Sequence, residues 1–231
     1  HVIIKDNIIE KIVSELPNES DFDVVVDCEN NLLMPGFKNA HAHTAMTFLR
    51  SKADDSNLQD WLFKEIFPLE HNLHEGCIRE LSKVGILEYL TSGITAASDL
   101  YFFITEFKET ADKMGFRSTS IGMYHKEKRP TDYLRNLYFE SKKTGVSDVA
   151  IGMHSEYTAT DDMYDQTSVL LKDTGSMFYT HLGETASEVQ GCYERHGMSP
   201  VEWFDHLGFF DNGGAIFHGV YLNDKDLEIL K

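Results

Sequence analysis

The spacing of apolar residues alternates along most of the chain between helical periodicity and short buried runs. Helical spacing, with apolar residues on one face of each turn, predicts helices over 57–63, 72–90, 103–114, 130–143, 161–172, 186–196, 200–207 and from 223 onward. Short apolar runs between them predict strands over 94–99, 117–123, 149–153, 176–181 and 214–218. With a further strand leading into residue 41, this alternation predicts an α/β fold of about six βα units around a parallel sheet.

The first 33 residues follow a different pattern. Residues 2–13 are rich in β-branched side chains and are interrupted by Asp6-Asn7, which predicts two short strands joined by a turn. Residues 22–26 predict a third strand. We therefore expect part of a small β domain over 1–33 and the main domain over 34–231.

Charge and composition narrow the classes of function. The 231 residues carry 21 Lys and Arg against 38 Asp and Glu, a formal net charge of −17. This charge repels phosphate backbones and anionic lipids, so we expect no nucleic-acid partner and no membrane-surface role. No apolar run approaches the roughly 20 residues that a membrane-spanning helix needs. The three widely spaced cysteines form no disulfide framework, which favours a reducing cytoplasm.

The first candidate for chemistry is a pair of histidines, His41 and His43, separated by one small residue. In an extended backbone, residues i and i+2 point to the same face, so both imidazoles would project together from the end of a strand. Two neutral imidazoles that converge suit a divalent cation such as zinc, with Zn–N distances near 2.0–2.1 Å. A pair of surface histidines on a loop is the simpler alternative.

Three more histidines stand where predicted strands end: His154, His181 and His218. A single histidine of this kind is more often a hydrogen-bonded core residue than a ligand. Repetition on the first, fourth, fifth and sixth strands favours one shared site, because the carboxyl ends of parallel strands meet at one edge. The other histidines are expected at the surface: His71, His74, His125, His196 and His206.

Glu184 follows closely after His181 and supplies a carboxylate beside the predicted metal. An acid that lies near a metal without binding it can take a proton from the metal-bound water and deliver it to the substrate. A carboxylate at the start of a helix also interacts favourably with the helix dipole, and both roles are compatible.

Several motifs together make the chain resemble the amidohydrolase superfamily, in the branch of methylthioadenosine/S-adenosylhomocysteine deaminases and chlorohydrolase-like triazine hydrolases. The motifs occur in the same order and spacing over nearly the whole chain. They are 34–47 (MPGFKNAHAHTAMT), 49–50 (LR), 60–62 (DWL), 68–70 (PLE), 93–99 (GITAASD), 154–158 (HSEYT), 181–185 (HLGET) and 218–222 (HGVYL).

The resemblance implies a (β/α)8 TIM barrel, of which about six βα units are present, with part of a small N-terminal β-sandwich domain. It implies one divalent metal, zinc by default with iron, manganese or nickel as alternatives. The implied metal ligands are His41, His43, His181 and His218. Glu184 and His218 are the implied catalytic residues, with Glu184 as the proton shuttle. The implied substrate-binding residues are His154, Trp61 and Glu70; plain core packing is an equally open role for Trp61.

The implied reaction is hydrolytic deamination of a purine nucleoside or a related aminated heterocycle, by attack of a metal-bound hydroxide. An alternative is hydrolysis of another leaving group, as in chlorohydrolases and N-alkylamine hydrolases, because the attacking species is the same. Adenosine-type members have basic residues after the third strand that meet a substrate carboxylate, and here residues 125–129 read HKEKR.

One expected ligand is missing from the sequence. The family's fifth ligand is an aspartate that ends the eighth strand, whereas this sequence stops just after the sixth; Asp99 ends the second strand and is not a substitute. We therefore expect a fragment of a longer protein, and an inactive metal-binding fold is a third interpretation. An open six-stranded barrel exposes strand edges, so a homo-oligomer is expected as well.

Overall fold

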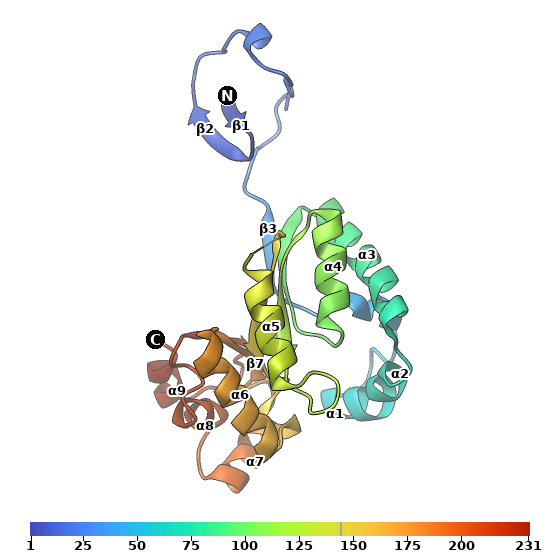
Figure 1. The fold of residues 1–231 in the computed structure, drawn as a ribbon, viewed down its shortest axis with the longest axis vertical. Coiled ribbons are helices and arrows are strands. Elements are labelled where there is room, and N and C mark those ends of the chain that lie inside the picture. Colours follow the sequence, from blue (N-terminus) through green and yellow to red (C-terminus); the bar gives the residue numbers. More distant parts are fainter. Residues whose placement is uncertain (144) are drawn as a thin grey trace. The chain divides into compact units, whose positions relative to one another are not determined.

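In the computed structural model, which describes residues 1–143 and 145–231, the chain forms two units, His1–Pro35 and Gly36–Lys231 (Figure 1). In the first unit, β1 (Val2–Lys5) pairs antiparallel with β2 (Ile8–Ile12). Asp6, with φ of +56°, occupies the turn between them, as Asp and Asn tolerate this conformation better than most residues. A short 3-10 turn, η1 (Glu19–Asp21), follows.

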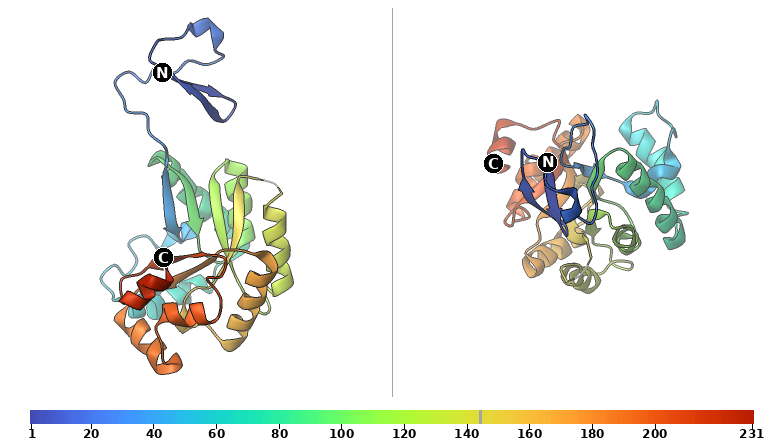
Figure 2. Two further views of the ribbon diagram at one scale, coloured as in Figure 1. Left: turned by 90° about the vertical axis from the view of Figure 1, so that its left-hand side faces the viewer. Right: turned by 90° about the horizontal axis from the view of Figure 1, so that it is seen from above.

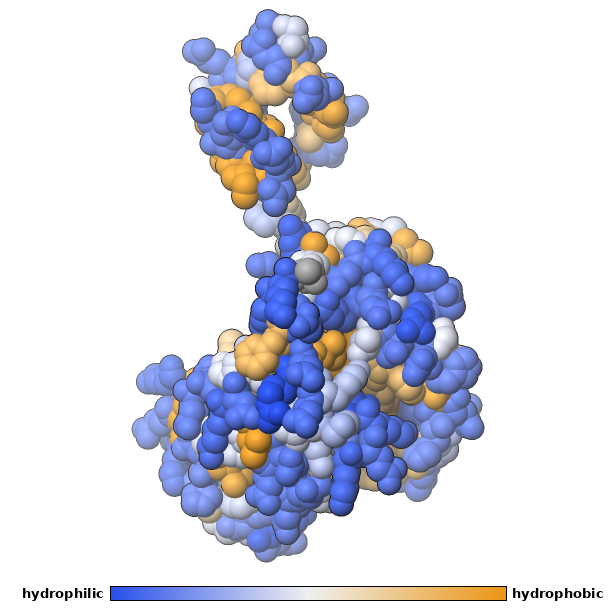
Figure 3. Space-filling model, in the orientation of Figure 1, coloured by the Kyte–Doolittle hydropathy of each residue, from blue (hydrophilic) through white to orange (hydrophobic). Residues whose placement is uncertain are grey.

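The prediction of a third strand over residues 22–26 is wrong. These residues have no strand partner in the part of the chain that the structure describes, and Val24 and Val26 are about three-quarters exposed. β-branched residues favour a strand only when the backbone groups find hydrogen-bond partners. Apolar side chains of this unit are visible on its surface in Figure 3.

The second unit contains a six-stranded parallel sheet in sequence order, with helices between successive strands (Figures 1 and 2). Its strands are β3 (Phe37–Ala42), β4 (Ile94–Asp99), β5 (Arg117–Met123), β6 (Ser147–Gly152), β7 (Phe178–Leu182) and β8 (Gly214–His218). Phe217 of β8 stacks on His41 of β3 with 4.1 Å between ring centroids, so the first and sixth strands approach each other at this end. The architecture is a partial (β/α)8 barrel, which confirms the predicted fold class.

The helices follow the predicted order with shifted ends, and the structure adds the 3-10 turns η2 and η4, which were not predicted. The helical elements are η2 (Thr44–Leu49), α1 (Leu58–Asp60), the π-helical turn η3 (Trp61–Ile66), α2 (Phe67–Glu70), α3 (Glu75–Thr91), α4 (Ile104–Met114), α5 (Thr131–Ser141), η4 (Glu156–Thr158), α6 (Asp161–Thr174), α7 (Ala186–His196), α8 (Pro200–His206) and α9 (Asp224–Ile229). The predicted helix over 57–63 continues instead through α1, η3 and α2. Pro68 does not interrupt it, because this proline lies in the first turn of α2, where its missing N–H costs little. None of the helices described in residues 1–143 and 145–231 is both long and apolar enough to cross a membrane.

Local sequence signals explain where the best-defined helices begin and end. Thr185 and Glu188 form a capping box at the start of α7, and Gly197, with φ of +73°, ends it. The largest buried cluster packs helices against β6 and β7 and includes Leu134, Ile151, Leu170, Phe178, Phe204 and Phe209. This packing holds the carboxyl ends of β6, β7 and β8 in fixed positions next to one another.

Candidate metal centre

The end of β3 places His41 and His43 together, with 4.8 Å between ring centroids. The neighbouring strand fixes this segment: the Leu100 N–H donates to Ala42 O (2.9 Å), and His43 Nδ1 lies 2.5 Å from Leu100 O. A carbonyl oxygen only accepts hydrogen bonds, so the proton of His43 is on Nδ1 and its Nε2 carries a free lone pair.

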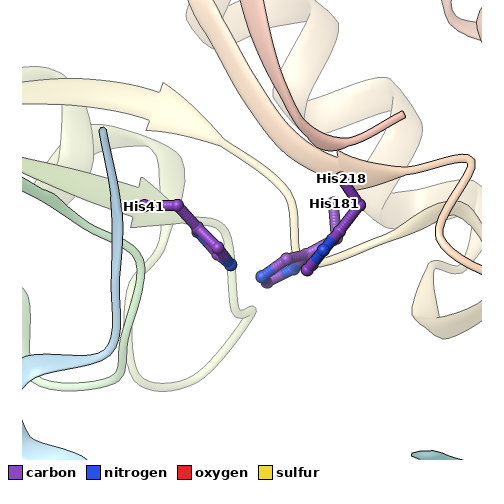
Figure 4. Close-up of side chains that lie close together, drawn as sticks. All are labelled: His41, His181 and His218. Atoms are coloured by element: carbon purple, nitrogen blue, oxygen red, sulfur yellow. The ribbon is translucent and has the colours of Figure 1, made fainter. Parts of the chain in front are cut away.

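The ends of β7 and β8 contribute His181 and His218, whose strands are paired with His181 opposite Phe217. His181 Nδ1 lies 2.8 Å from His154 O, so His181 also presents an unprotonated Nε2. Figure 4 shows His41, His181 and His218 converging from three strands. His218 has φ of +78°, a conformation that non-glycine residues rarely adopt and that concentrates at functional sites.

These side chains fit a divalent cation. Ligand atoms of His41, His181 and His218 all lie within 4.8 Å of one another. His43 Nε2 lies 3.3 Å from His181 Nε2, and two lone pairs at this distance repel each other unless a cation or a proton lies between them. His41 Nδ1 is buried without a hydrogen-bond partner among the described residues. The set matches the nitrogen ligands that zinc takes, with backbone carbonyls behind two of the rings.

The surroundings keep these imidazoles neutral, which is the form that binds metal. Burial, with the neighbouring His43, lowers the pKa of His41 to about 4. Burial, with His154 and His43 next, lowers the pKa of His181 to about 2. The pKa values of His43 and His218 are also lowered, mainly by burial. Protons therefore compete weakly for this site at neutral pH.

Glu184 lies beside the histidines in the loop between β7 and α7. Its Oε1 is 3.4 Å from His218 Nε2, and burial raises the pKa of its carboxyl group. A raised pKa makes the carboxylate a better proton acceptor, and a carboxyl group in this position can take up and return a proton. Sequence reasoning missed the residue that holds this loop: Glu188, which is buried and accepts N–H groups of Gly183 and Glu184, both at 2.8 Å. The spacing of Thr185 and Glu188 is typical of a capping box, and this pattern is the sequence signal that could have identified Glu188.

His154 follows β6, and its ring centroid lies 4.8 Å from that of His181. Its Nδ1 lies within hydrogen-bond distance of the Ser155 and Thr158 hydroxyls (3.0 and 3.2 Å), which leaves Nε2 for a ligand. Burial lowers its pKa to about 4. His154 therefore contributes twice, through its carbonyl to His181 and through its ring to the space beside the cluster.

Trp61 and Glu70 lie in a small cavity next to the histidines rather than among them. The cavity is lined by both residues together with His43, Phe67, Tyr101 and His154, among others. Burial raises the pKa of Glu70, and the Tyr101 hydroxyl donates to its Oε1 (2.6 Å). Trp61 also lines a larger neighbouring cavity of about 310 Å³ that contains Arg50 and Glu88. Its position at two cavities does not match plain core packing.

Two sequence expectations need correction or refinement. His196, expected at the surface, is mostly buried; it contacts Glu156 at 3.0 Å and stacks on Trp203. This arrangement depends on helix packing that periodicity cannot reveal. Asp99, set aside as a metal ligand, is buried and accepts the Thr44 N–H (2.6 Å), and burial raises its pKa to about 6. It supports the segment that carries His43.

The predicted basic segment 125–129 places Arg129 near the cavity. Its Nε donates to Met123 O (2.8 Å), and its guanidinium lies 6.0 Å from the Phe102 ring centroid. Met123 and Phe102 both line the cavity of Trp61 and Glu70. Within residues 1–143 and 145–231, no carboxylate forms an ion pair with Arg129.

Comparison with known proteins agrees with this geometry. A family model described as "Amidohydrolase family" matches residues 32–231. The 5'-deoxyadenosine deaminase of Methanococcus maripaludis is 33% identical over 248 residues, covering 100% of this chain and 57% of the relative. A 5-methylthioadenosine/S-adenosylhomocysteine deaminase of Thermococcus sibiricus is 34% identical over 237 residues, covering 99% and 55%. The chain thus spans somewhat more than half the length of these curated relatives.

Solved structures show the same architecture. An adenosine deaminase from Xanthomonas campestris with bound zinc is similar with a TM-score of 0.77 and 25% identity, over 85% of this chain and 47% of the other. A guanine deaminase from C. acetobutylicum with bound guanine has a TM-score of 0.87 and 18% identity, over 99% and 59%. The second likeness concerns the fold alone.

Proposed function

Since the chain belongs to the amidohydrolase family, we propose that the protein hydrolytically deaminates a purine nucleoside or a related aminated heterocycle. The observation that carries the proposal is the convergence of neutral imidazoles from β3, β7 and β8 with Glu184 at their edge. Relatives named as deaminases of 5'-deoxyadenosine and of methylthioadenosine or S-adenosylhomocysteine support the substrate class.

His41, His43, His181 and His218 would hold one divalent metal, with zinc as the first candidate and iron, manganese or nickel as others. When bound, the metal supplies the Lewis acidity that makes water nucleophilic near neutral pH. Glu184 takes a proton from the attacking water and delivers it to the nitrogen that leaves as ammonia. Its raised pKa suits both transfers.

The neighbouring cavity would bind the rest of the substrate. Trp61 offers an aromatic face for the base, and Glu70 offers a carboxylate for sugar hydroxyls, with the Tyr101 hydroxyl fixing its orientation. His154 Nε2 would hydrogen-bond to the substrate or the attacking oxygen. Arg129, without a carboxylate partner in the described structure, favours substrates that carry an anionic group beyond the sugar.

The proposal is tested by ammonia release from the zinc-loaded, full-length protein with 5'-deoxyadenosine, 5'-methylthioadenosine and S-adenosylhomocysteine, of which the last carries the anionic group that Arg129 favours. Glu184→Gln is expected to lower kcat by at least about 100-fold while zinc content stays unchanged, because the amide cannot carry the proton. Glu194→Gln, an exposed position on α7, is the matched control and is expected to behave like the wild type. Loss of zinc in Glu184→Gln would instead make Glu184 a ligand.

A substrate panel that includes chlorinated and alkylaminated triazines distinguishes deamination from the two alternative functions. Chloride or alkylamine release without ammonia from nucleosides would favour the alternative hydrolase. Zinc binding with no turnover of any substrate would favour a non-catalytic metal-binding protein. Either result would refute the deaminase proposal.

We also propose a cytoplasmic location and self-association. Cys28, Cys77 and Cys192 are all free thiols in the structure, which suits a reducing compartment. Sedimentation analysis that finds only monomers at micromolar concentration would contradict the second point.

A further inference from the structure

The loop that follows β6 supplies two groups to the candidate centre. The carbonyl oxygen of His154 accepts hydrogen bonds from both the backbone N–H (3.0 Å) and the Nδ1 (2.8 Å) of His181. The His154 ring lines the cavity that also contains Trp61 and Glu70. Any shift of this loop therefore moves a predicted ligand and a predicted substrate contact together. What holds the loop in place bears directly on the function of the site.

The loop carries a buried carboxylate only two residues after His154. The Glu156 side chain is 1% exposed, and its oxygens accept from Arg195 Nε (2.8 Å) and Arg195 Nη2 (2.5 Å). His196 Nε2 lies 3.0 Å from Glu156 Oε1, and the Tyr164 hydroxyl donates to Glu156 O (3.1 Å). A buried carboxylate is tolerated only where such partners meet it, so the position of Arg195 fixes the position of the loop.

Arg195 and His196 are the last two residues of α7, whose first turn is tied to the loop of Glu184 by Glu188. One helix thus contacts the Glu184 loop at its N-terminal end and the His154 loop at its C-terminal end. Because a helix of 11 residues is a stiff element, it sets the separation of the two loops.

We propose that Glu156, through its ion pair with Arg195, is a positioning residue of the active site. It holds the His154 loop against α7, so that His154 O keeps the His181 ring oriented and His154 Nε2 keeps its place beside the metal. The inference rests on the proposed function for the role of His154 toward substrate. Its effect on the His181 ring stands without any substrate.

The test compares three changes in the zinc-loaded, full-length protein. Arg195→Met leaves Glu156 buried without its main partner, so both the melting temperature and the zinc affinity are expected to fall. Glu156→Leu combined with Arg195→Met removes the ion pair without leaving a charge unpaired, so the melting temperature is expected to recover. In this double variant, the zinc affinity and kcat are expected to stay about 10- to 100-fold below the wild-type values. Competition with a chelator measures the zinc affinity. Arg195→Lys retains the charge without the bidentate geometry and is expected to be intermediate.

The matched control is Arg135→Met, which removes another guanidinium ion pair, to Asp173, between α5 and α6. It is expected to leave zinc affinity unchanged. A double variant that regains both its melting temperature and its zinc affinity would overturn the proposal and make the ion pair purely structural. Unchanged zinc affinity in all Arg195 variants would also overturn it. Absence of deaminase activity in the wild type would refute the proposed function, while the zinc measurements would still decide this inference.

Discussion

The two sides of the histidine cluster are held in different ways. On the β3 side, residues at the end of the adjacent strand β4 fix the segment that carries His43. Leu100 O accepts a hydrogen bond from the His43 ring, and the Asp99 carboxylate accepts one from the Thr44 N–H. These contacts join residues at the ends of two directly paired strands, with Ala42 in register with Asp99. Once the strands pair, little else is needed to orient His43.

On the β7–β8 side, the support comes from helix α7. Glu188 captures the backbone that carries Glu184, and Arg195 anchors Glu156 next to His154. These contacts depend on how a helix docks against two loops rather than on strand pairing alone. The comparison teaches that strand order brings the ligands together, whereas the orientation of the His181 ring and the positions of the proton-transfer and substrate-facing groups also need correctly packed helices.

The largest expected effect comes from removing one ligand on either side. His43→Ala and His181→Ala are each expected to weaken zinc binding by about 100- to 1,000-fold, because each of the four ligands contributes roughly a quarter of the free energy of zinc binding. Both Nε2 atoms face the same point, 3.3 Å apart, so the two losses should be similar. Chelator competition measures them. A loss confined to one of the two variants would show that the two sides do not share one metal.

The next effect tests the packing on the β6–β7 side. A methyl group at Gly152 would lie 2.4 Å from both Tyr179 O and Ile121 Cγ2, so Gly152→Ala must push apart paired strands next to His154. We expect a loss of about 2–3 kcal/mol in the free energy of unfolding, measured by urea denaturation.

The control is Gly76→Ala in the first turn of α3, where the new methyl group meets only the His74 ring at 3.3 Å. Since alanine is the better helix former, stability should stay the same or rise by up to about 1 kcal/mol. Equal destabilisation by both substitutions would contradict the packing argument.

The difference between the two sides also explains what could be predicted from the sequence. His41, His43, His154, His181 and His218 were found because strand ends are visible in the apolar pattern, and the structure brings these side chains together. The parallel order of the strands followed from the same pattern and is confirmed.

Contacts made by α7 were not predictable in this way. Glu156 and Arg195 are 39 residues apart, and nothing in the periodicity of either segment reveals that they pair. His196 was expected at the surface for the same reason. Helical spacing shows which face of a helix is apolar, but not which loop its last turn reaches.

A smaller effect is expected when the support on the β3 side is removed. Asp99→Ala leaves the Thr44 N–H without an acceptor in a buried position, which we expect to cost about 1–2 kcal/mol in the free energy of unfolding. Zinc affinity should fall as well, because His43 directly precedes Thr44. Urea denaturation and chelator competition measure the two effects. Unchanged values for both would show that Leu100 O alone fixes this side.

The finest comparison replaces one supporting carboxylate on each side with its amide. Asp99→Asn keeps an oxygen for the single Thr44 N–H, so we expect a change of no more than about 0.5 kcal/mol. Glu188 uses one oxygen for the Gly183 N–H and the other for the Glu184 N–H, and an amide keeps only one of these acceptors. Glu188→Gln should therefore cost about 1 kcal/mol and lower kcat more than zinc affinity, since the backbone of Glu184 shifts while the ligands stay. Equal effects of the two amides on kcat would mean that α7 has no special part in placing Glu184.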